Sequence, residues 1–301
     1  MRYRSKTKSI RGVVLRLVVG IITSLFVFGL SNAQNAEGWT SDKGQRSKAE
    51  SVSCGDTITN YAVLTNNLDC SEYNGDAALT LAEGARLNLN RKTVTGNDKI
   101  KCIKIIGDGT RVWNGTVTGC DDGILVSSSD RNKIICVEVS DSKNKGIDID
   151  DGDENLVMKC SVAGSGKQGI RINGGDSNKI FINNVYGNGR DGIEINNGDS
   201  NLVFSNRVKD NGWGTKPWYY AGIDVLSGSK NNEIKYNRAG CNLGCVGTND
   251  ETCTARYRDF WDENVDDEGK CNSTNEWENN SITCKNAVPE CTPSPDWVPT
   301  P

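Results

Sequence analysis

The chain has 301 residues, with 35 lysine and arginine residues against 39 aspartate and glutamate residues, and it contains no histidine. The acidic balance argues against nucleic acid as a partner, because phosphate binding needs a basic surface. The absence of histidine excludes mechanisms that depend on a histidine base.

Residues 1–33 predict a secretory signal peptide. Six basic residues and no acidic residue fall within residues 1–16, an apolar run extends from Leu17 to Leu30, and the small-x-small sequence Ser31-Asn32-Ala33 follows. The run is shorter than the ~20 residues of a membrane span, so we expect cleavage after Ala33 and not a membrane anchor. The mature protein would be secreted or periplasmic, with no membrane span, and its formal net charge would change from −4 to −10.

Residues 34–53 are polar and irregular and predict a linker. From Asp56 to Cys120 the sequence is rich in short strand patterns, such as ALTLAEGARLNLN, which predict the first coils of a repeated structure.

Residues 121–243 repeat two short patterns with one period. The pattern G-I-x-[IV] begins at Gly123, Gly146, Gly169, Gly192 and Gly222, so that three equal steps are followed by one longer step. The pattern N-x-[IV] begins at Asn132, Asn155, Asn178, Asn201 and Asn232. Two patterns that keep one period indicate a solenoid, in which each repeat buries its apolar face against the next.

The repeat predicts strands and not helices. G-I-x-[IV] alternates over too few residues for a helix pair, is β-branched, and is bounded by Gly, Asn, Asp and Ser. Each repeat therefore predicts one coil of a parallel β-helix, with successive coils about 4.8 Å apart and equivalent residues stacked in ladders.

The two patterns resemble those of the pectate-lyase-like superfamily. The longer form N-x-[IV]-x-x-N is complete in three repeats, with its last asparagine at Asn183, Asn206 and Asn237. The resemblance covers residues 56–243 and implies an all-β fold, a right-handed parallel β-helix with coils of about 23 residues. We expect the β-helix to span residues 54–243, and residues 244–301 to form a cysteine-rich cap and a proline-rich tail that cover its open end.

All 12 cysteines lie beyond the predicted signal peptide, which favours disulfides in an oxidising compartment. Six of them, from Cys241 to Cys291, lie in the C-terminal region that lacks the repeat. The interval between Cys136 and Cys160 is almost that of one repeat, which would place them on neighbouring coils. The predicted pairs before the cap are Cys54–Cys70, Cys102–Cys120 and Cys136–Cys160.

Several ladders predict the interior. The isoleucines of G-I-x-[IV] and the apolar residues of N-x-[IV] are expected in the core, and the asparagines at bends, where their amides bond neighbouring backbone. A further row allows three interpretations: a core corner, an outer stripe covered by another segment, or a surface on which sugars stack. That row is Ile135, Met158, Phe181 and Phe204.

The outward position x of G-I-x-[IV] is the expected functional wall. It holds Leu125, Asp148, Arg171, Glu194 and Asp224. This position resembles the groove in which β-helix polysaccharide enzymes keep their working residues. An arginine between carboxylates suits a lyase, in which calcium neutralises a uronate and a basic group removes the α-proton.

We therefore expect Arg171 and Glu194 to be catalytic, and Asp148, Asp150 and Asp224 to bind calcium. The alternative is a ladder of opposite charges that only stabilises the sheet.

The step between Gly192 and Gly222 is longer than the others, and the extra residues lie within NGWGTKPWYYAG. Insertions in solenoids form loops, often on the binding face. Trp213, Trp218 and Tyr219 are predicted to contact sugar rings, and Asn196, beside the outward wall, is predicted to bind the substrate. Lys216 or Tyr220 is predicted to abstract the proton, with Arg171 assisting. The alternative is that the aromatic residues cover an apolar edge.

The sequence thus predicts an exported, monomeric protein that binds an acidic polysaccharide or cell-surface glycan, with lyase-like cleavage left open. An inverting glycoside hydrolase is a less favoured reaction. A non-catalytic adhesion module and a purely structural β-helix are the alternatives. Polygalacturonase-like members of the superfamily carry a G-H-G histidine, and many uronan epimerases rely on histidine, so their usual mechanisms are excluded here.

Overall fold

A computed structural model describes residues 52–212, 220–246, 254–257, 259–264 and 274–282. Within these ranges the chain forms strands and no helix. The predicted signal peptide lies outside them, and none of the residues described provides a helix able to span a membrane.

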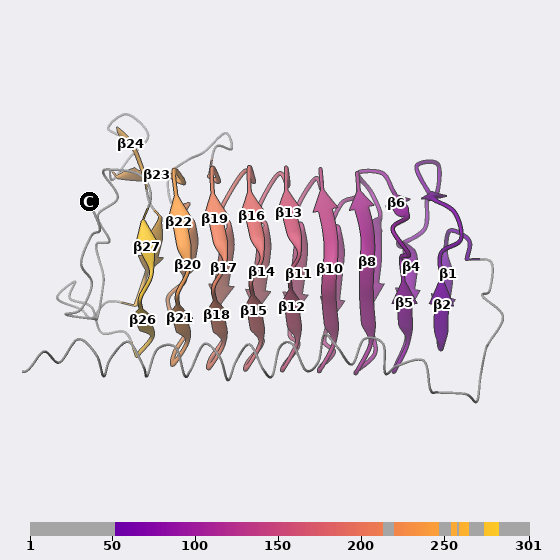
Figure 1. The fold of residues 1–301 in the computed structure, drawn as a ribbon, viewed down its shortest axis with the longest axis horizontal. Coiled ribbons are helices and arrows are strands. Elements are labelled where there is room, and N and C mark those ends of the chain that lie inside the picture. The colour runs from indigo at the N-terminus through magenta and orange to yellow at the C-terminus, as the bar shows by residue number, and fades with distance from the viewer. Residues whose placement is uncertain (1–51, 213–219, 247–253, 258, 265–273, 283–301) are drawn as a thin grey trace, which may run out of the picture. The chain divides into compact units, whose positions relative to one another are not determined.

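One long parallel sheet contains a strand from each coil in chain order (Figure 1). Its strands are β1 (Asp56–Ile58), β4 (Ala77–Leu81), β7 (Lys101–Ile105), β9 (Ile124–Ser127), β11 (Ile147–Asp150), β14 (Ile170–Asn173), β17 (Ile193–Asn196), β20 (Ile223–Val225) and β25 (Phe260–Asp262). The G-I-x-[IV] repeats form β9, β11, β14, β17 and β20. We call this the first sheet.

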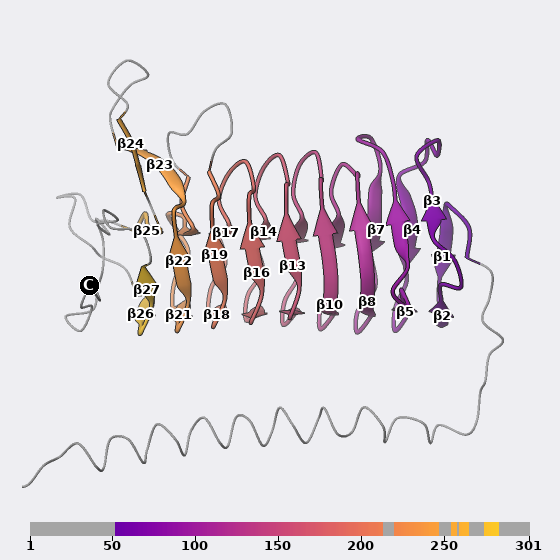
Figure 2. The ribbon, with the colours of Figure 1, turned by 45° about the horizontal axis from the view of Figure 1, so that its top comes forward.

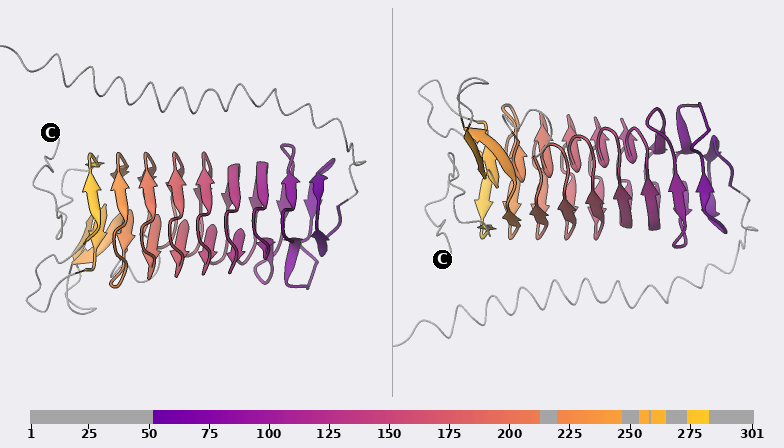
Figure 3. Two further views of the ribbon diagram at one scale, coloured as in Figure 1. Left: turned by 90° about the horizontal axis from the view of Figure 1, so that it is seen from below. Right: turned by 90° about the horizontal axis from the view of Figure 1, so that it is seen from above.

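A second parallel sheet runs along the other side of the coils and bends within each coil, as the two views of Figure 3 show. The strands before the bend are β2 (Tyr61–Val63), β5 (Arg86–Asn88), β12 (Leu156–Met158), β15 (Lys179–Phe181), β18 (Leu202–Phe204), β21 (Glu233–Lys235) and β26 (Glu276–Glu278). Those after it are β3 (Leu68–Asp69), β6 (Thr93–Thr95), β13 (Ser161–Ala163), β16 (Asn184–Tyr186), β19 (Arg207–Lys209), β22 (Arg238–Gly240) and β27 (Ser281–Ile282).

Two longer strands, β8 (Arg111–Thr118) and β10 (Lys133–Ser140), continue through this bend, and an antiparallel pair, β23 (Leu243–Val246) and β24 (Thr254–Tyr257), projects near the C-terminal end (Figure 2). The strands β25, β26 and β27 add a further turn of parallel pairing past residue 243.

Consecutive coils pair in the register that the repeat predicts. Ile147 lies opposite Ile170, Ile170 opposite Ile193, and Ile193 opposite Ile223 across the longer step. The prediction of a parallel β-helix with coils of about 23 residues is confirmed. The register is therefore kept on both sides of the longer step.

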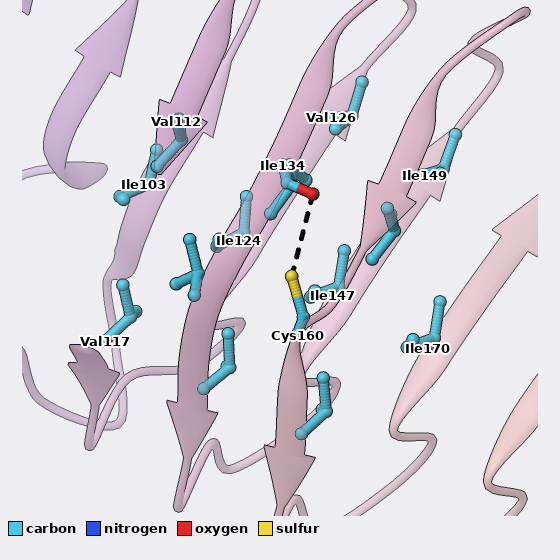
Figure 4. Packing of buried hydrophobic residues seen from close by; sticks show 14 of the residues in the cluster. Ile103, Val112, Val117, Ile124, Val126, Ile134, Ile147, Ile149, Cys160 and Ile170 are labelled. Carbon is cyan, nitrogen blue, oxygen red and sulfur yellow. Dashed lines mark hydrogen bonds between the residues drawn. The ribbon is translucent and has the colours of Figure 1, made fainter. Parts of the chain in front are cut away.

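Stacked aliphatic side chains fill the interior (Figure 4). Ile124, Ile147, Ile170 and Ile193 have no exposed surface. The repeat glycine allows the close approach of the coils, because a Cβ at Gly169 would lie 2.4 Å from Val185 Cγ1 and 2.7 Å from the carbonyl oxygen of Gly192. Any side chain at this position would force neighbouring coils apart.

Buried asparagines form ladders at the bends, as predicted. The backbone N–H of Asn178 donates to Oδ1 of Asn201 at 2.8 Å, and its Nδ2 donates to the carbonyl oxygen of Gly152 at 2.9 Å. Asn183, Asn206 and Asn237 repeat this arrangement. A third ladder, through Asn188, Asn211 and Asn242, was not expected from the sequence. Each amide therefore satisfies backbone groups that the bends leave unpaired.

The disulfides Cys54–Cys70 and Cys102–Cys120 are present as predicted. The predicted Cys136–Cys160 bridge is wrong, because both cysteines are free. One coil is one residue shorter than the interval between these cysteines, so Cys160 lies level with Val137 and takes its inward position. Cys136 is exposed at the bend, whereas the Cys160 thiol donates inward to the carbonyl oxygen of Ile134 (Figure 4).

The row Ile135, Met158, Phe181 and Phe204 lies on the outer side of the second sheet and is half-buried. In β12, β15 and β18 the middle residue faces inward, so the last residue, which belongs to this row, faces outward. Of the three interpretations, the core corner is therefore wrong.

We predict that Asn206→Ala lowers the free energy of unfolding by about 2–4 kcal/mol, because the N–H of Asn183 and the carbonyl oxygen of Ile180 lose their buried partner. Urea titration followed by circular dichroism measures this. The control is Asn60→Ala, which removes an exposed amide that donates to Thr59 and should change stability by less than about 0.5 kcal/mol. Equal effects of the two substitutions would contradict the role of the ladder.

We predict that the folded protein reacts with a thiol alkylating agent at Cys136 and not at Cys160. Burial raises the pKa of the Cys160 thiol to about 12, so its thiolate is scarce and shielded. Peptide mass spectrometry before and after denaturation measures this. A disulfide-linked Cys136–Cys160 peptide would show that the register argument is wrong.

Candidate functional site

The outward residues of four successive strands of the first sheet share one wall, as predicted. Asp148 lies opposite Arg171, Arg171 opposite Glu194, and Glu194 opposite Asp224. The spacing between neighbours is about 4.8 Å. The wall is less open than the sequence suggests, because Asp148, Glu194 and Asp224 are 2%, 7% and 1% exposed.

A second polar row lies beside the wall and accounts for part of this burial. It consists of the residues just before each repeat glycine: Asp122, Lys145, Gln168 and Asp191. Sequence reasoning did not identify this row. The signal was available, since the position recurs with the period of G-I-x-[IV] and is polar in four coils.

Asp148 forms ion pairs with two basic side chains. Oδ1 and Oδ2 of Asp148 accept hydrogen bonds from Nε and Nη2 of Arg171 at 2.7 and 3.0 Å, and Lys145 Nζ lies 3.1 Å from Oδ2. Burial disfavours the guanidinium charge, but the hydrogen bonds and charge of Asp148 outweigh it, so the pKa of Arg171 is raised. An arginine held in this way can position a substrate and neutralise its negative charge, but it stays protonated and does not act as a base.

Asp191 and Glu194 form a buried pair of carboxyl groups. Gln168 Nε2 donates to Oε2 of Glu194 at 2.6 Å, and the N–H of Ala221 donates to Oδ1 of Asp191 at 2.6 Å. Burial, and then the charge of Glu194, hold the pKa of Asp191 well above its ordinary value. Burial also raises the pKa of Glu194, although Gln168 and Arg171 oppose it. The two carboxyl groups thus interact closely in a buried place, where ionisation of both at once is disfavoured.

A row of amides runs parallel to the wall on its more exposed side. Nδ2 of Asn173 donates to Oδ1 of Asp150, and Nδ2 of Asn196 donates to Oδ1 of Asn173, both at 2.7 Å. These residues are aligned by register, one per coil, and each is only half-buried. They present hydrogen-bonding groups at a regular spacing along the axis.

The predicted aromatic loop is described only at its edge. Trp213, Lys216, Trp218 and Tyr219 lie outside the described residues. Tyr220 is half-buried, and its ring lies 5.7 Å from the guanidinium carbon of Arg190, the residue beside Asp191. Tyr220 is thus at the same end of the wall as the carboxyl pair.

The residues predicted to bind calcium offer few free oxygen ligands. Both oxygens of Asp148 already contact Arg171 or Lys145, and Oδ1 of Asp150 accepts from Asn173. Where the chain is described, no three acidic or cysteine side chains gather to suit a metal ion. Hard cations need several free oxygen ligands, so these residues do not fit calcium.

The sequence family agrees with this architecture. A family profile described as "right handed beta helix region" matches residues 101–256, just over half of the chain. The chain belongs to the right-handed β-helix family. No curated protein matches it.

Solved structures with a similar fold are distant in sequence. Tailspike protein 2 of Escherichia coli O157:H7 bacteriophage CAB120 is 12% identical with a TM-score of 0.54, covering 75% of this chain and 34% of that chain. The Dettilon tailspike is 13% identical with a TM-score of 0.51, covering 75% and 52%. An alginate lyase from Paenibacillus sp. FPU-7 is 14% identical with a TM-score of 0.46, covering 62% and 75%.

This right-handed β-helix chain spans only about a third to a half of the two tailspikes. At these identities the similarity shows a common fold alone.

We predict that Asp191→Asn makes the protein more stable relative to the unsubstituted chain as the pH rises. Because the folded pKa of Asp191 is raised, the folded state keeps a proton that the unfolded state loses above the ordinary value of 3.8, so this group costs stability with rising pH. Asparagine can accept from Ala221 and donate to Glu194 without ionising. Urea unfolding from pH 4 to 8 measures the difference.

A difference in stability that is constant with pH, or that moves against the variant as the pH rises, would show that Asp191 does not hold a proton in the fold.

Proposed function

We propose that this β-helix binds an extended polysaccharide along the wall formed by β11, β14 and β17. The register-aligned row Asp150, Asn173 and Asn196 carries this proposal, because it repeats polar groups once per coil. A ligand built of repeating units can meet such a row over several coils, whereas a compact ligand would use one. Amide and carboxylate side chains are suited to sugar hydroxyl groups.

Lys145 and Arg171 offset part of the acidic charge beside this row. Arg171 contacts Asp148 and Asp150, and Lys145 contacts Asp148 and Asp122. A uronate carboxylate approaching Arg171 therefore meets less repulsion than the acid count suggests. This supports an acidic polysaccharide as the substrate class.

We further propose that Asp191 and Glu194 supply the proton if the bound chain is cleaved. A carboxyl group with a raised pKa can protonate a leaving oxygen or hydrogen-bond a uronate. Arg171 is better suited to hold the substrate than to act as the base. Tyr220, beside Arg190, remains the proposed proton acceptor of a lyase-type elimination.

Non-catalytic binding is the second candidate. The burial of Asp148, Glu194 and Asp224 favours it, because a catalytic carboxyl group must reach its substrate. In this case the wall holds a glycan and leaves it intact. Export is proposed with both candidates and is supported by the Cys54–Cys70 and Cys102–Cys120 disulfides.

The test uses a panel of acidic and neutral polysaccharides, with binding measured by calorimetry and cleavage by the absorbance of unsaturated sugar ends and by reducing ends. We expect Asn196→Ala to weaken binding by about 3- to 10-fold, as one lost hydrogen bond implies. We expect Asp191→Asn to keep binding and to lower cleavage by at least about 100-fold.

The matched control is Asn60→Ala, an exposed amide outside the wall, which should change neither quantity. Binding without new chain ends would select the non-catalytic candidate. A panel that the unsubstituted chain neither binds nor cleaves would overturn the proposal.

A further inference from the structure

The outer face of the second sheet has a charge pattern that no part of the proposed function uses. One outward position runs through eight coils in unbroken register, on β5, β8, β10, β12, β15, β18, β21 and β26. In chain order it holds Arg86, Arg111, Lys133, Leu156, Lys179, Leu202, Glu233 and Glu276. We call these residues the charge column. It is basic at its N-terminal end and acidic at its C-terminal end.

An apolar column lies two residues further along the same strands, on the same face. Its members from β8 to β18 are Trp113, Ile135, Met158, Phe181 and Phe204. Ile182 and Tyr236, at the adjoining bend, are each 51% exposed. The apolar column continues as Lys235 and Glu278 in the acidic coils.

The face therefore has an apolar centre between ends of opposite charge. Lys133 and Lys179 are exposed, and in the described part of the chain neither makes a salt bridge. At the other end Lys235 lies 3.0, 2.7 and 3.6 Å from carboxylates of Glu233, Glu276 and Glu278. One lysine against three glutamates leaves that end acidic.

Such a pattern is complementary to itself under a two-fold rotation. A second copy lying antiparallel places its acidic end against the basic end of the first, and its apolar centre against the apolar centre. A parallel copy would place like charges together. Two-fold interfaces use one surface patch on both subunits, and an apolar centre with a polar rim is their usual anatomy.

Other occupants fit this face less well. A polyanionic glycan or an anionic membrane along the axis would meet the acidic end. The aromatic rings also pack against one another: Phe181 and Phe204 are edge to face at 5.8 Å, and Phe204 and Tyr236 are tilted at 5.2 Å. Rings used this way do not offer a row of flat faces for sugar stacking.

We propose that the chain forms an antiparallel two-fold dimer through this face, with an axis near Phe181 and Phe204. This replaces the monomer expected from the sequence, and it is independent of the proposed function because the wall lies on the first sheet. In the dimer Lys133 of each copy faces the Glu233 and Glu276 end of the other, and each contact occurs twice.

The test exchanges charges in the full chain, with sedimentation velocity over micromolar concentrations as the measurement. Lys133→Glu alone and Glu276→Lys alone should each raise the dimer dissociation constant by at least about tenfold, because each puts two like-charged contacts into the dimer. An equal mixture of the two variants should dimerise again, since both mixed contacts are then of opposite charge. Lys99→Glu, exposed and away from this face, is the control and should leave dimerisation unchanged.

Restored dimerisation in the mixture supports the proposal. A monomeric unsubstituted chain would overturn it, and would leave the face to another segment or partner. Tighter self-association of Glu276→Lys, or a mixture no better than its components, would also overturn it. Circular dichroism confirms that each variant is folded, so that weaker association is not mistaken for unfolding.

Discussion

Parallel backbone hydrogen bonds between consecutive coils set the register on which the side-chain contacts of this structure depend. The N–H of Ile147 donates to the carbonyl oxygen of Gly169, and the same bond recurs one coil later from Ile170 to Gly192, both at 2.9 Å. Because side chains alternate between faces, a slip of one residue would turn a whole coil inside out. The repeat glycine lets coils approach, and the asparagine ladders satisfy the bends. The glycines and the asparagine ladders together maintain the register over the described coils.

This constraint creates the electrostatics of the wall. Stacking puts side chains of equivalent position about 4.8 Å apart, whatever their charge. Asp148 and Arg171 attract at that distance, and Lys145 adds a second cation. One coil further, Asp191 and Glu194 meet where burial opposes two charges, which raises the pKa of both carboxyl groups. The raised pKa of Asp191 follows from its burial in the coil and from the charge of Glu194, whereas the neutral Gln168 bonds Glu194.

The two sheets stack their residues in the same way but present different surfaces. On the first sheet the exposed row is polar and regular, which suits a repeating ligand. On the second sheet the outward residues change from basic through apolar to acidic along the axis, which suits a copy of the same surface in the opposite direction. A solenoid can carry both, because each face is a separate column of positions in the repeat.

The sequence by itself determined the fold, the coil length and the shared wall of Asp148, Arg171, Glu194 and Asp224, since a constant period is visible in the spacing of glycines and asparagines. The predicted Cys136–Cys160 bridge was wrong because their interval exceeds one coil by one residue, which places Cys160 at the inward position of Val137 and leaves Cys136 exposed. The sequence also did not show that Arg171 is held by Asp148, or that Asp191 reaches Glu194. Those contacts depend on burial and side-chain direction, which only the packed coils decide, whereas periodicity is a property of the chain alone.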